Sequence, residues 1–316
     1  MRKLLDRCLS LNDFEKYAVK RLPHPLYAYV SGGVEDNIAL HNTRTSYTDY
    51  SLIPENMVDV SQRNTQVELF GHRYAAPVGL APMGISAITG FQGDLALARA
   101  AAQKNVPFIM SGSSLIRLED VAAVNSNMWF QAYLPKTLPE IDALVDRVQR
   151  AAIPVLVVTV DTPVKANREN NVRAGFATPF RPSLSLAWQG VTHPRWLAGT
   201  LIKTLLTTGM PYFENNQAIR GAPLFSNNAV REFSGRSQLT GQHIENIRER
   251  WRGAMVIKGI LSSKDAMRCK AMGIDGIVVS NHGGRQLDTV ISPIHVLAEI
   301  VEAAGDMTVM IDSGIR

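Results

Sequence analysis

Cysteine is scarce in this sequence, and it occurs in no paired motif. Cys8 and Cys269 are the only two among 316 residues, and their separation fits neither a zinc site nor a redox pair. No cluster of His, Asp and Glu has metal-ligand spacing either, so no bound metal is expected. Such sparing use of cysteine favours a reduced, cytoplasmic setting.

Long apolar runs and strong charge are also missing. No stretch reaches about 18 uncharged apolar residues, which argues against a membrane-spanning helix. Charged residues between Met1 and Arg7 argue against a signal peptide. The net charge of +5 is spread along the chain, so no basic run marks a nucleic-acid partner. This small excess favours acidic small molecules or an anionic membrane surface.

From Pro77 onward the chain alternates short apolar runs with helical segments. The apolar runs, which have the composition of buried strands, are 78–81, 106–110, 129–134, 153–160, 254–258, 275–280 and 307–311. Strict alternation predicts parallel strands joined by right-handed helical crossovers. The expected fold is α/β, a (β/α)8 TIM barrel with about seven strands present and incomplete at the carboxyl end. A doubly wound sheet is the alternative, but no Gly-x-Gly-x-x-Gly follows the first run.

Two segments interrupt this alternation within what is expected to be a single domain, 1–316. Residues 1–76 are expected to form an outer, helical segment that becomes irregular and polar at 51–75. Residues 162–239 form an insertion too long for a plain loop. Its middle, 196–206, is apolar but short. It fits packing over the barrel, an interface with another chain, or contact with a membrane surface.

Polar side chains follow the ends of the predicted strands. In a parallel barrel these ends meet at one rim, so the residues are expected to converge. They are Ser111, Gln131, Tyr133, Thr159, Asp161, Arg168, Lys258, His282, Arg285 and Asp312. The first strand instead ends in Pro82, Met83 and Gly84, whose backbone can approach a ligand closely. Arginine and tyrosine suit a carboxylate ligand, a His beside an Asp suits a base, and a buried Lys suits negative charge on a cofactor. The six other histidines fall in predicted loops or helices and are expected to be structural or solvated.

The clearest motif is the run from Ser280 to Gln286, Ser-Asn-His-Gly-Gly-Arg-Gln. Its plain interpretation is a polar turn after a core strand. The shared rim favours a functional interpretation, because the imidazole of His282 exchanges protons near pH 7. The guanidinium of Arg285 can bind a carboxylate with two parallel hydrogen bonds.

This run resembles the active-site signature of the FMN-dependent L-2-hydroxy-acid dehydrogenases and oxidases. The similarity covers nearly the whole chain and is weak only in the insertion. The matching runs are 22–36, 82–84, 129–133, 159–163, 256–259, 280–286 and 311–316. The resemblance implies an FMN cofactor and oxidation of an L-2-hydroxy acid, of the lactate or mandelate type, to the 2-oxo acid.

The resemblance also assigns roles at the reacting centre. His282 is implied to be the catalytic base, with Asp161 hydrogen-bonded to it to stabilise the imidazolium. Arg285 and Tyr29 are implied to bind the substrate carboxylate. Tyr133 and Arg168 are implied to assist substrate binding.

A second implied set binds FMN. Lys258 would lie near N1 and the C2 carbonyl of the flavin, and Ser280 near the ring or ribityl chain. Asp312, Gly314 and Arg316 would begin the ribityl and phosphate site. The residues implied to hold the isoalloxazine are Pro82, Met83, Gly84, Ser111, Gln131 and Thr159.

The sequence departs from the family pattern in two places. It stops at Arg316, where the family continues with an eighth βα unit that carries a Gly-Arg pair for the FMN phosphate. We therefore expect residues 1–316 alone to hold FMN weakly, and a non-catalytic truncated paralogue is an alternative of another class. Ser113 stands where glycolate oxidase carries a bulky aromatic residue, which leaves room for acids as large as mandelate.

Weaker resemblances bear on the electron acceptor and the cellular setting. Residues 191–196 resemble the insertion of bacterial L-lactate dehydrogenases, which implies contact with the inner membrane face and a quinone or other respiratory acceptor. Gly84 is also typical of dehydrogenase members. The alternative is an oxidase that uses O2. The family resemblance further implies a homotetramer.

Overall fold

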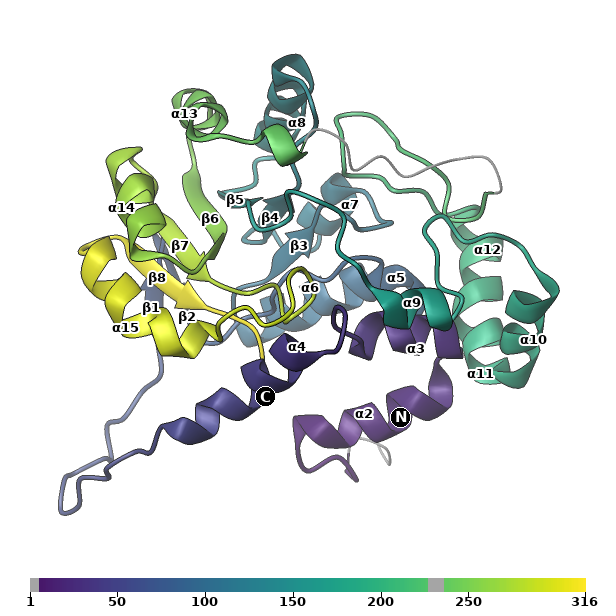
Figure 1. The fold of residues 1–316 in the computed structure, drawn as a ribbon, viewed down its shortest axis with the longest axis horizontal. Helices are drawn as coiled ribbons and strands as arrows, with labels where there is room; N and C mark the ends of the chain where they lie inside the picture. The colour runs from purple at the N-terminus through teal and green to yellow at the C-terminus, as the bar shows by residue number, and fades with distance from the viewer. Residues whose placement is uncertain (1–5, 227–235) are drawn as a thin grey trace.

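Parallel strands form the centre of the molecule (Figure 1). The computed structural model describes residues 6–226 and 236–316. In this part of the chain, six strands lie in sequence order, each hydrogen-bonded to the next. They are β3 (Ile109–Ser111), β4 (Trp129–Ala132), β5 (Val155–Thr159), β6 (Ala254–Ile260), β7 (Gly276–Val279) and β8 (Thr308–Ile311). In-order parallel pairing is what right-handed crossovers produce, and it confirms the predicted parallel α/β arrangement.

The predicted first strand, 78–81, is present only as a single parallel bridge between Leu80 and Phe108. The Leu80 N–H donates to the Pro107 carbonyl (2.9 Å), and the Ile109 N–H donates to the Leu80 carbonyl (3.0 Å). Prolines at 77 and 82 flank the segment, and proline has no N–H with which to extend a ladder. Among the described residues no ladder joins this segment to β8, so backbone hydrogen bonds do not close the barrel.

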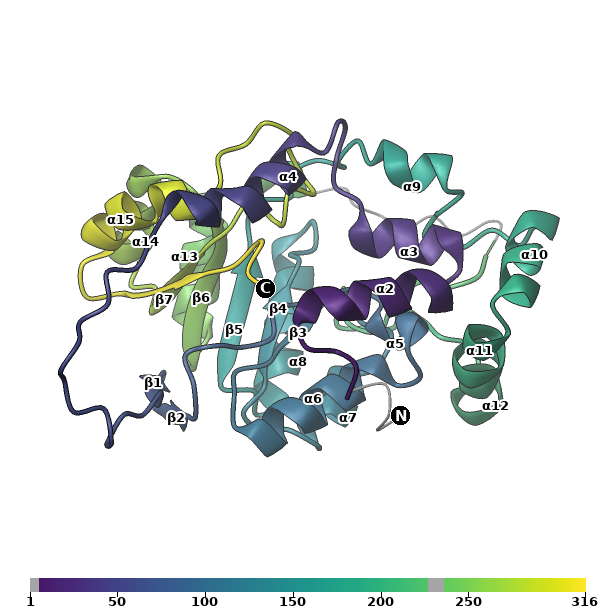
Figure 2. The same cartoon turned by 90° about the horizontal axis from the view of Figure 1, so that it is seen from below.

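Helices between the strands cover the outside of the sheet (Figures 1 and 2). They are α5 (Ser86–Thr89), α6 (Gly93–Lys104), α7 (Leu118–Ala122), α8 (Leu138–Arg150), α13 (Gly241–Arg250), α14 (Ser263–Ala271) and α15 (Pro293–Ala304). Helix α8 shows how the sequence sets a boundary. The Thr137 N–H donates to the Glu140 carboxylate (3.0 Å) in a capping box. A capping box of this kind fixes the residue at which the helix begins, and it therefore fixes the length of the loop between β4 and α8.

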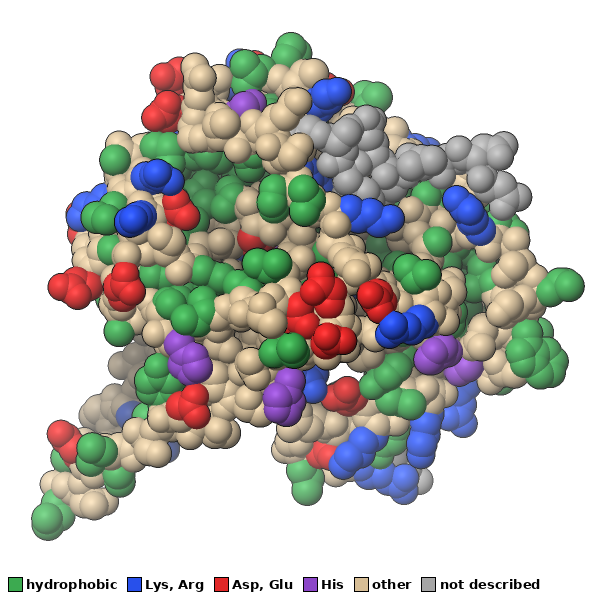
Figure 3. Space-filling view, viewed as in Figure 1, with side chains coloured by type: hydrophobic (Ala, Val, Ile, Leu, Met, Phe, Trp, Pro, Cys, Tyr) green, Lys and Arg blue, Asp and Glu red, His purple; other side chains and the backbone are tan. Residues whose placement is uncertain are grey.

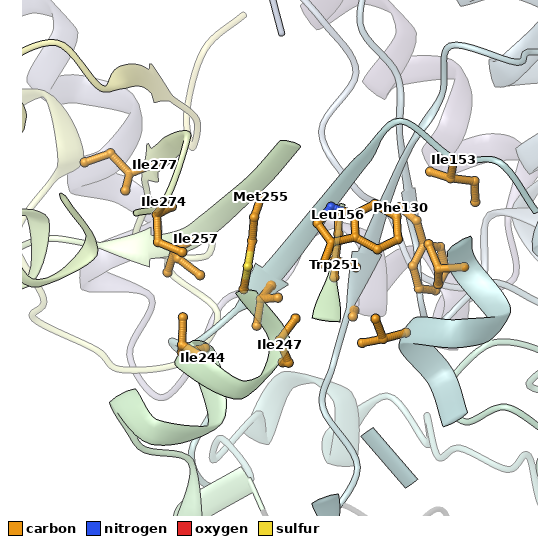
Figure 4. Close-up of a cluster of buried hydrophobic side chains, with 14 of the residues drawn as sticks. Phe130, Ile153, Leu156, Ile244, Ile247, Trp251, Met255, Ile257, Ile274 and Ile277 are labelled. Carbon is orange, nitrogen blue, oxygen red and sulfur yellow. The ribbon is translucent and has the colours of Figure 1, made fainter. Parts of the chain in front are cut away.

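The main hydrophobic core lies between the sheet and these helices. In Figure 4, Phe130 of β4 and Leu156 of β5 lie in one cluster with Ile247 of α13 and Met255 of β6. All four side chains are 1% exposed or less. Burying one such side chain contributes roughly 1.5–3 kcal/mol. This packing holds the strands, and therefore their carboxyl ends, in fixed positions.

The N-terminal segment begins with helices, as predicted. They are α2 (Leu11–Arg21), α3 (His24–Ser31), α4 (Ile38–Thr45) and the 3-10 helix η1 (Ser46–Asp49). Residues 50–66 then run as an extended arm away from the sheet (Figure 2). The arm exposes apolar side chains, among them Leu52, Ile53 and Met57.

The expectation that 51–75 is irregular throughout is wrong at its end. There, β1 (Val67–Leu69) and β2 (His72–Tyr74) form an antiparallel hairpin. Phe70 (φ +51°) and Gly71 (φ +78°) make its two-residue turn, and two left-handed residues match the twist of a hairpin. Phenylalanine rarely adopts this conformation, so a phenylalanine at the first turn position does not predict a hairpin. Edge-on contact with the Trp129 ring (5.3 Å) accompanies the unusual backbone.

The insertion folds as a group of short helices beside the barrel. They are α9 (Glu169–Arg173), α10 (Leu184–Thr192), α11 (Pro194–Trp196), the π-helix η2 (Leu197–Ile202), α12 (Lys203–Thr208) and the 3-10 helix η3 (Arg236–Gln238). Trp196 is buried, and its Nε1 donates to the Ile88 carbonyl (2.7 Å). One face of the apolar stretch therefore packs on the barrel, which was one of the three expected alternatives.

The opposite face of this helical group is exposed and apolar. Figure 3 shows hydrophobic side chains along the edge of the molecule at α10. Large exposed residues of the group are Leu184, Trp188, Val191, Ile202, Leu205 and Leu206. Within residues 6–226 and 236–316, every helix is too short or too polar to cross a bilayer.

A core substitution tests the packing. Leu156→Ala removes a side chain that is 1% exposed, so we expect the free energy of unfolding to fall by about 2–5 kcal/mol. Urea denaturation measures this change. Leu52→Ala, on the extended arm, is the matched control and should shift it by less than about 0.5 kcal/mol. Equal effects at the two positions would contradict this account of the core.

Candidate active site

His282 lies in a tight loop immediately after β7. Its backbone is left-handed (φ +58°), as are those of Gly283 (+67°) and Gly284 (+68°), and three such residues turn the chain sharply. Gly284 is required at its position, because a Cβ there would collide with the backbone of Leu40. The His282 N–H donates to Ser280 Oγ (3.1 Å), which ties the loop to the strand end.

Asp161, just past β5, holds the His282 ring. His282 Nδ1 lies 2.9 Å from Asp161 Oδ1, and both side chains are largely buried. Because a carboxylate oxygen accepts, Nδ1 carries the hydrogen and Nε2 keeps its lone pair. Gly259 makes room for this contact. Its φ is +107°, and a Cβ at that position would lie 2.5 Å from Asp161 Cβ.

The surroundings of His282 keep its ring neutral. Burial lowers the pKa of His282, and Lys258 and Arg168 act in the same direction against the opposing effect of Asp161. A neutral imidazole near pH 7 is the form that a base requires. Nε2 lies 3.5 Å from the Tyr133 hydroxyl at the end of β4. The lone pair on His282 Nε2 therefore lies beside the Tyr133 hydroxyl, at the rim formed by the strand ends.

Two arginines, one in the segment after β5 and one in the loop after β7, lie close to each other. Arg168 Nε donates to the Arg285 carbonyl (3.0 Å), and its Nη2 donates to Gln286 Oε1 (3.1 Å). The Arg285 guanidinium donates to the carbonyls of Tyr29 (2.6 Å) and Gly32 (2.7 Å), at the end of α3. It also lies 5.1 Å from the Tyr29 ring centroid. The structure thus brings Tyr29, Arg168 and Arg285 together, with the Arg285 side chain held by main-chain carbonyls.

Lys258 is a buried cation between two strand ends. Its Nζ lies 2.7 Å from Asp312 Oδ2 and donates to Ser280 Oγ (2.6 Å). Burial disfavours its charge, but the carboxylates of Asp312 and Asp161 outweigh burial and raise the pKa of Lys258. Burial likewise opposes the charge of Asp312, yet Lys258 lowers the pKa of that carboxyl. The pair is therefore ionised, and it fixes a positive charge at the rim.

Three neighbouring strand ends carry polar groups that fit a polar ring edge. Ser111 Oγ donates to Gln131 Oε1 (3.1 Å). Gln131 Nε2 and Thr159 Oγ1 are buried without a hydrogen-bond partner among the described residues. Leaving such a group unpaired costs about 1–3 kcal/mol, so a ligand with complementary donors and acceptors would be stabilised here. The pyrimidine edge of a flavin has that character, and the donor set fits FMN.

Three further residues of the predicted cofactor set lie in the segment before α5. Pro82, Met83 and Gly84 link the Leu80 bridge to α5. A Cβ on Gly84 would lie 3.1 Å from Ser113 Cβ and 3.3 Å from the Tyr29 hydroxyl. A glycine therefore keeps the backbone close to these side chains.

The end of the chain provides a second cationic position. Gly314 is left-handed (φ +77°) and lies against the Thr43 carbonyl. Burial and the nearby charge of Arg44 lower the pKa of Arg316.

Two residues near the reacting centre lie outside the set that the strand-end pattern predicts. Gly259 and Arg236 were not predicted, although Arg236 Cζ lies 4.2 Å from the Tyr133 ring centroid. Arg236 begins η3, away from any strand end, so the strand-end rule could not find it. The described residues contain no group of three His, Cys, Asp or Glu side chains placed to hold a metal ion.

Known proteins resemble the chain over nearly its whole length. A model of the FMN-dependent dehydrogenase family matches residues 18–316. An L-lactate dehydrogenase of Pectobacterium atrosepticum is 37% identical over 309 residues, which cover 96% of this chain and 78% of that protein. An (S)-mandelate dehydrogenase of Pseudomonas putida is 35% identical, with 97% of this chain and 77% of that protein covered.

Solved structures give the same picture. The crystal structure of a monotopic membrane protein, (S)-mandelate dehydrogenase, superposes with a TM-score of 0.85 at 32% identity and covers 98% of this chain and 82% of that chain. A mandelate oxidase mutant with a C4a-OH-FMN adduct has a TM-score of 0.76 at 31% identity, with 96% and 78% covered.

The contact between Asp161 and His282 can be tested by titration. Asp161→Asn removes the carboxylate that favours the imidazolium, so the pKa of His282 should fall further, by about one unit or more. NMR titration of the imidazole measures it. Asp49→Asn is the matched control, because Asp49 makes a 2.9 Å contact with the more exposed His295. The argument fails if His282 keeps its pKa in the Asp161 variant.

Proposed function

The chain belongs to the FMN-dependent dehydrogenase family, and on this basis we propose that it oxidises an L-2-hydroxy acid to the corresponding 2-oxo acid. The observation that carries the proposal is the Asp161–His282 pair, with an Nε2 lone pair at a rim that also holds Arg168 and Arg285. A base beside cationic groups suits a substrate that carries both a hydroxyl and a carboxylate.

In this proposal each part of the substrate is bound by a named side chain. Arg285 and Tyr29 bind the substrate carboxylate, and Tyr133 and Arg168 orient the acid beside His282. His282 Nε2 accepts a proton from the substrate, and Asp161 stabilises the imidazolium that forms. When bound, FMN supplies the acceptor for the two electrons that the substrate loses.

Residues at the strand ends hold the cofactor in this proposal, within a single FMN-binding domain of residues 1–316. The positive charge of Lys258, which is buried, would stabilise negative charge on the reduced flavin ring, because charges interact strongly in a site of low dielectric. Asp312, Gly314 and Arg316 would hold the ribityl chain and phosphate. The residues that would hold the isoalloxazine are Pro82, Met83, Gly84, Ser111, Gln131, Thr159 and Ser280.

The exposed apolar face of α10 and α12 supports contact with a membrane surface. Leu184 (91% exposed), Trp188 (65%) and Leu206 (81%) would lose apolar area from water on binding there. The (S)-mandelate dehydrogenase with the similar structure is a monotopic membrane protein. We propose contact with the inner membrane face and electron transfer to a quinone or other respiratory acceptor. The homotetramer that the family resemblance implies is a further proposal, and light scattering can test it.

The central test is anaerobic reduction of the FMN-loaded enzyme. L-lactate or L-mandelate should bleach the flavin spectrum, and His282→Ala should bind FMN normally but be reduced at least about 10²-fold more slowly. His295→Ala is the control and should match the unmodified protein. Near-normal reduction of the His282 variant would remove this residue from the base role. No bleaching by any 2-hydroxy acid would favour a non-catalytic protein.

Reoxidation distinguishes the acceptors. Reduced enzyme should pass its electrons to a quinone analogue faster than to dissolved O2, and stopped-flow absorbance measures both rates. Faster reoxidation by O2 would instead assign the protein to the oxidases.

Membrane contact is tested with anionic phospholipid vesicles. The double variant Trp188→Ser, Leu206→Ser removes two exposed apolar side chains from the helical group and should weaken vesicle binding by roughly tenfold or more. Leu52→Ser, Ile53→Ser is the matched control, because these residues are similarly exposed on the arm. Sedimentation with vesicles measures binding. A larger loss in the control would place membrane contact elsewhere.

A further inference from the structure

The loop that carries His282 and Arg285 also carries a buried carboxylate. Asp288 is 4% exposed, and its oxygens accept two backbone hydrogen bonds at the start of α4. The Asp36 N–H donates to Oδ2 (3.0 Å), and the Ala39 N–H donates to Oδ1 (2.8 Å). Burial opposes the charge of Asp288, but backbone N–H donors outweigh burial and lower the pKa of the carboxyl. Asp288 is therefore ionised at neutral pH and satisfies backbone donors that the helix itself leaves unpaired.

The side chain of Arg285 binds the end of the preceding helix, α3. Its Nη1 donates to the carbonyls of Gly32 (2.7 Å) and Val30 (3.2 Å), and its Nη2 donates to the Tyr29 carbonyl (2.6 Å). A guanidinium has five N–H groups. The three bonds leave the Nε–H and one N–H of Nη2 without a further hydrogen-bond partner in the described part of the chain. Two N–H groups on neighbouring nitrogens fit the two oxygens of a carboxylate.

Residues 32–37, the linker between α3 and α4, join the segments that these two side chains bind. The linker passes directly over the loop, because a Cβ on Gly33 would lie 2.8 Å from the Gly284 carbonyl oxygen. The Glu35 N–H donates to the carbonyl of Asn167 (3.1 Å), the residue before the second arginine of the site. The position of the linker is therefore coupled to both segments that carry the arginines.

Loss of the Asp288 carboxylate would release one end of the linker and leave the base in place. The carbonyls at the end of α3 orient the guanidinium of Arg285, so a shift of this end turns the two remaining N–H groups away from the substrate. A misplacement of about 1 Å can cost about 10²-fold in rate. His282 is held separately, by Asp161 and by Ser280.

We propose that Asp288 is a positioning residue for substrate recognition, which anchors the linker 32–37 and so directs the two remaining N–H groups of Arg285 at the substrate carboxylate. Asp288 acts through Arg285 and not on the reacting atoms. Its loss weakens binding of the acid and leaves proton transfer to His282 intact. The inference rests on the proposed function and adds a residue that controls its carboxylate recognition.

Asp288→Asn tests this role in the FMN-loaded enzyme. Asparagine has the same size, but its NH2 group would face a backbone N–H that needs an acceptor. We expect KM for whichever of L-lactate and L-mandelate reduces the flavin to rise about tenfold or more, with kcat within about threefold. The ionisation of His282 in the pH profile of kcat/KM should stay where it is in the unmodified enzyme.

A binding measurement checks the same role without turnover. Pyruvate carries the carboxylate but has no hydroxyl to oxidise, and the change that it causes in flavin absorbance gives its dissociation constant. In Asp288→Asn this constant should rise by about the same factor as KM.

Two further variants and a control separate positioning from folding. Gly33→Ala displaces the linker without changing Asp288 and should also raise KM with little effect on kcat. Asp288→Glu keeps the charge and should restore part of the affinity. Asp13→Asn is the matched control, because Asp13 Oδ2 likewise accepts from two backbone N–H groups, of Leu9 (3.0 Å) and Ser10 (3.1 Å), before α2. It should leave KM unchanged.

The outcomes distinguish the positioning role from the underlying activity. An unchanged KM and an unchanged pyruvate affinity in Asp288→Asn would overturn the role and leave the proposed function intact. A fall in kcat with KM unchanged would overturn it too. If Asp288→Asn fails to bind FMN, an unchanged KM in Gly33→Ala would overturn it, and a raised KM there would support it. If no 2-hydroxy acid reduces the flavin of the unmodified enzyme, the proposed function fails and the role of Asp288 with it.

Discussion

The contact between Asp161 and His282 is the interaction on which the rest of the site depends. It joins the ends of β5 and β7, which are separated by β6 in the sheet and by 121 residues in the sequence. Gly259, at the end of β6, lacks the side chain that would block it. The order of three parallel strands and one glycine thus determine which imidazole nitrogen is left to accept a proton.

The same strand ends also place the positive charge of the site. Lys258 on β6 contacts Ser280 after β7 and Asp312 after β8. Ser280 accepts in addition from the His282 N–H. Base, buried cation and loop are therefore parts of one hydrogen-bonded group, and a change at Ser280 affects all of them.

Much of this arrangement could be predicted because parallel strands impose a simple rule. Strand ends meet at one rim, so the sequence alone predicts that Gln131, Thr159 and Lys258 lie close together. The rule predicts nothing about residues that do not follow a strand. Arg236 belongs to the insertion, and its contact with Tyr133 depends on tertiary packing that local sequence does not encode. The turn at Phe70 was missed for a related reason, since contact with Trp129 accompanies a backbone that phenylalanine seldom adopts.

The pH dependence of kcat/KM for anaerobic flavin reduction tests the central claim most directly, because it reports ionisations of the free enzyme. A base must be deprotonated, and burial lowers the pKa of His282 below its usual 6.5. The account predicts that kcat/KM rises with pH through one ionisation below 6.5 and is then level through neutral pH. A rate that is independent of pH in this range, or that rises only well above pH 6.5, would contradict it.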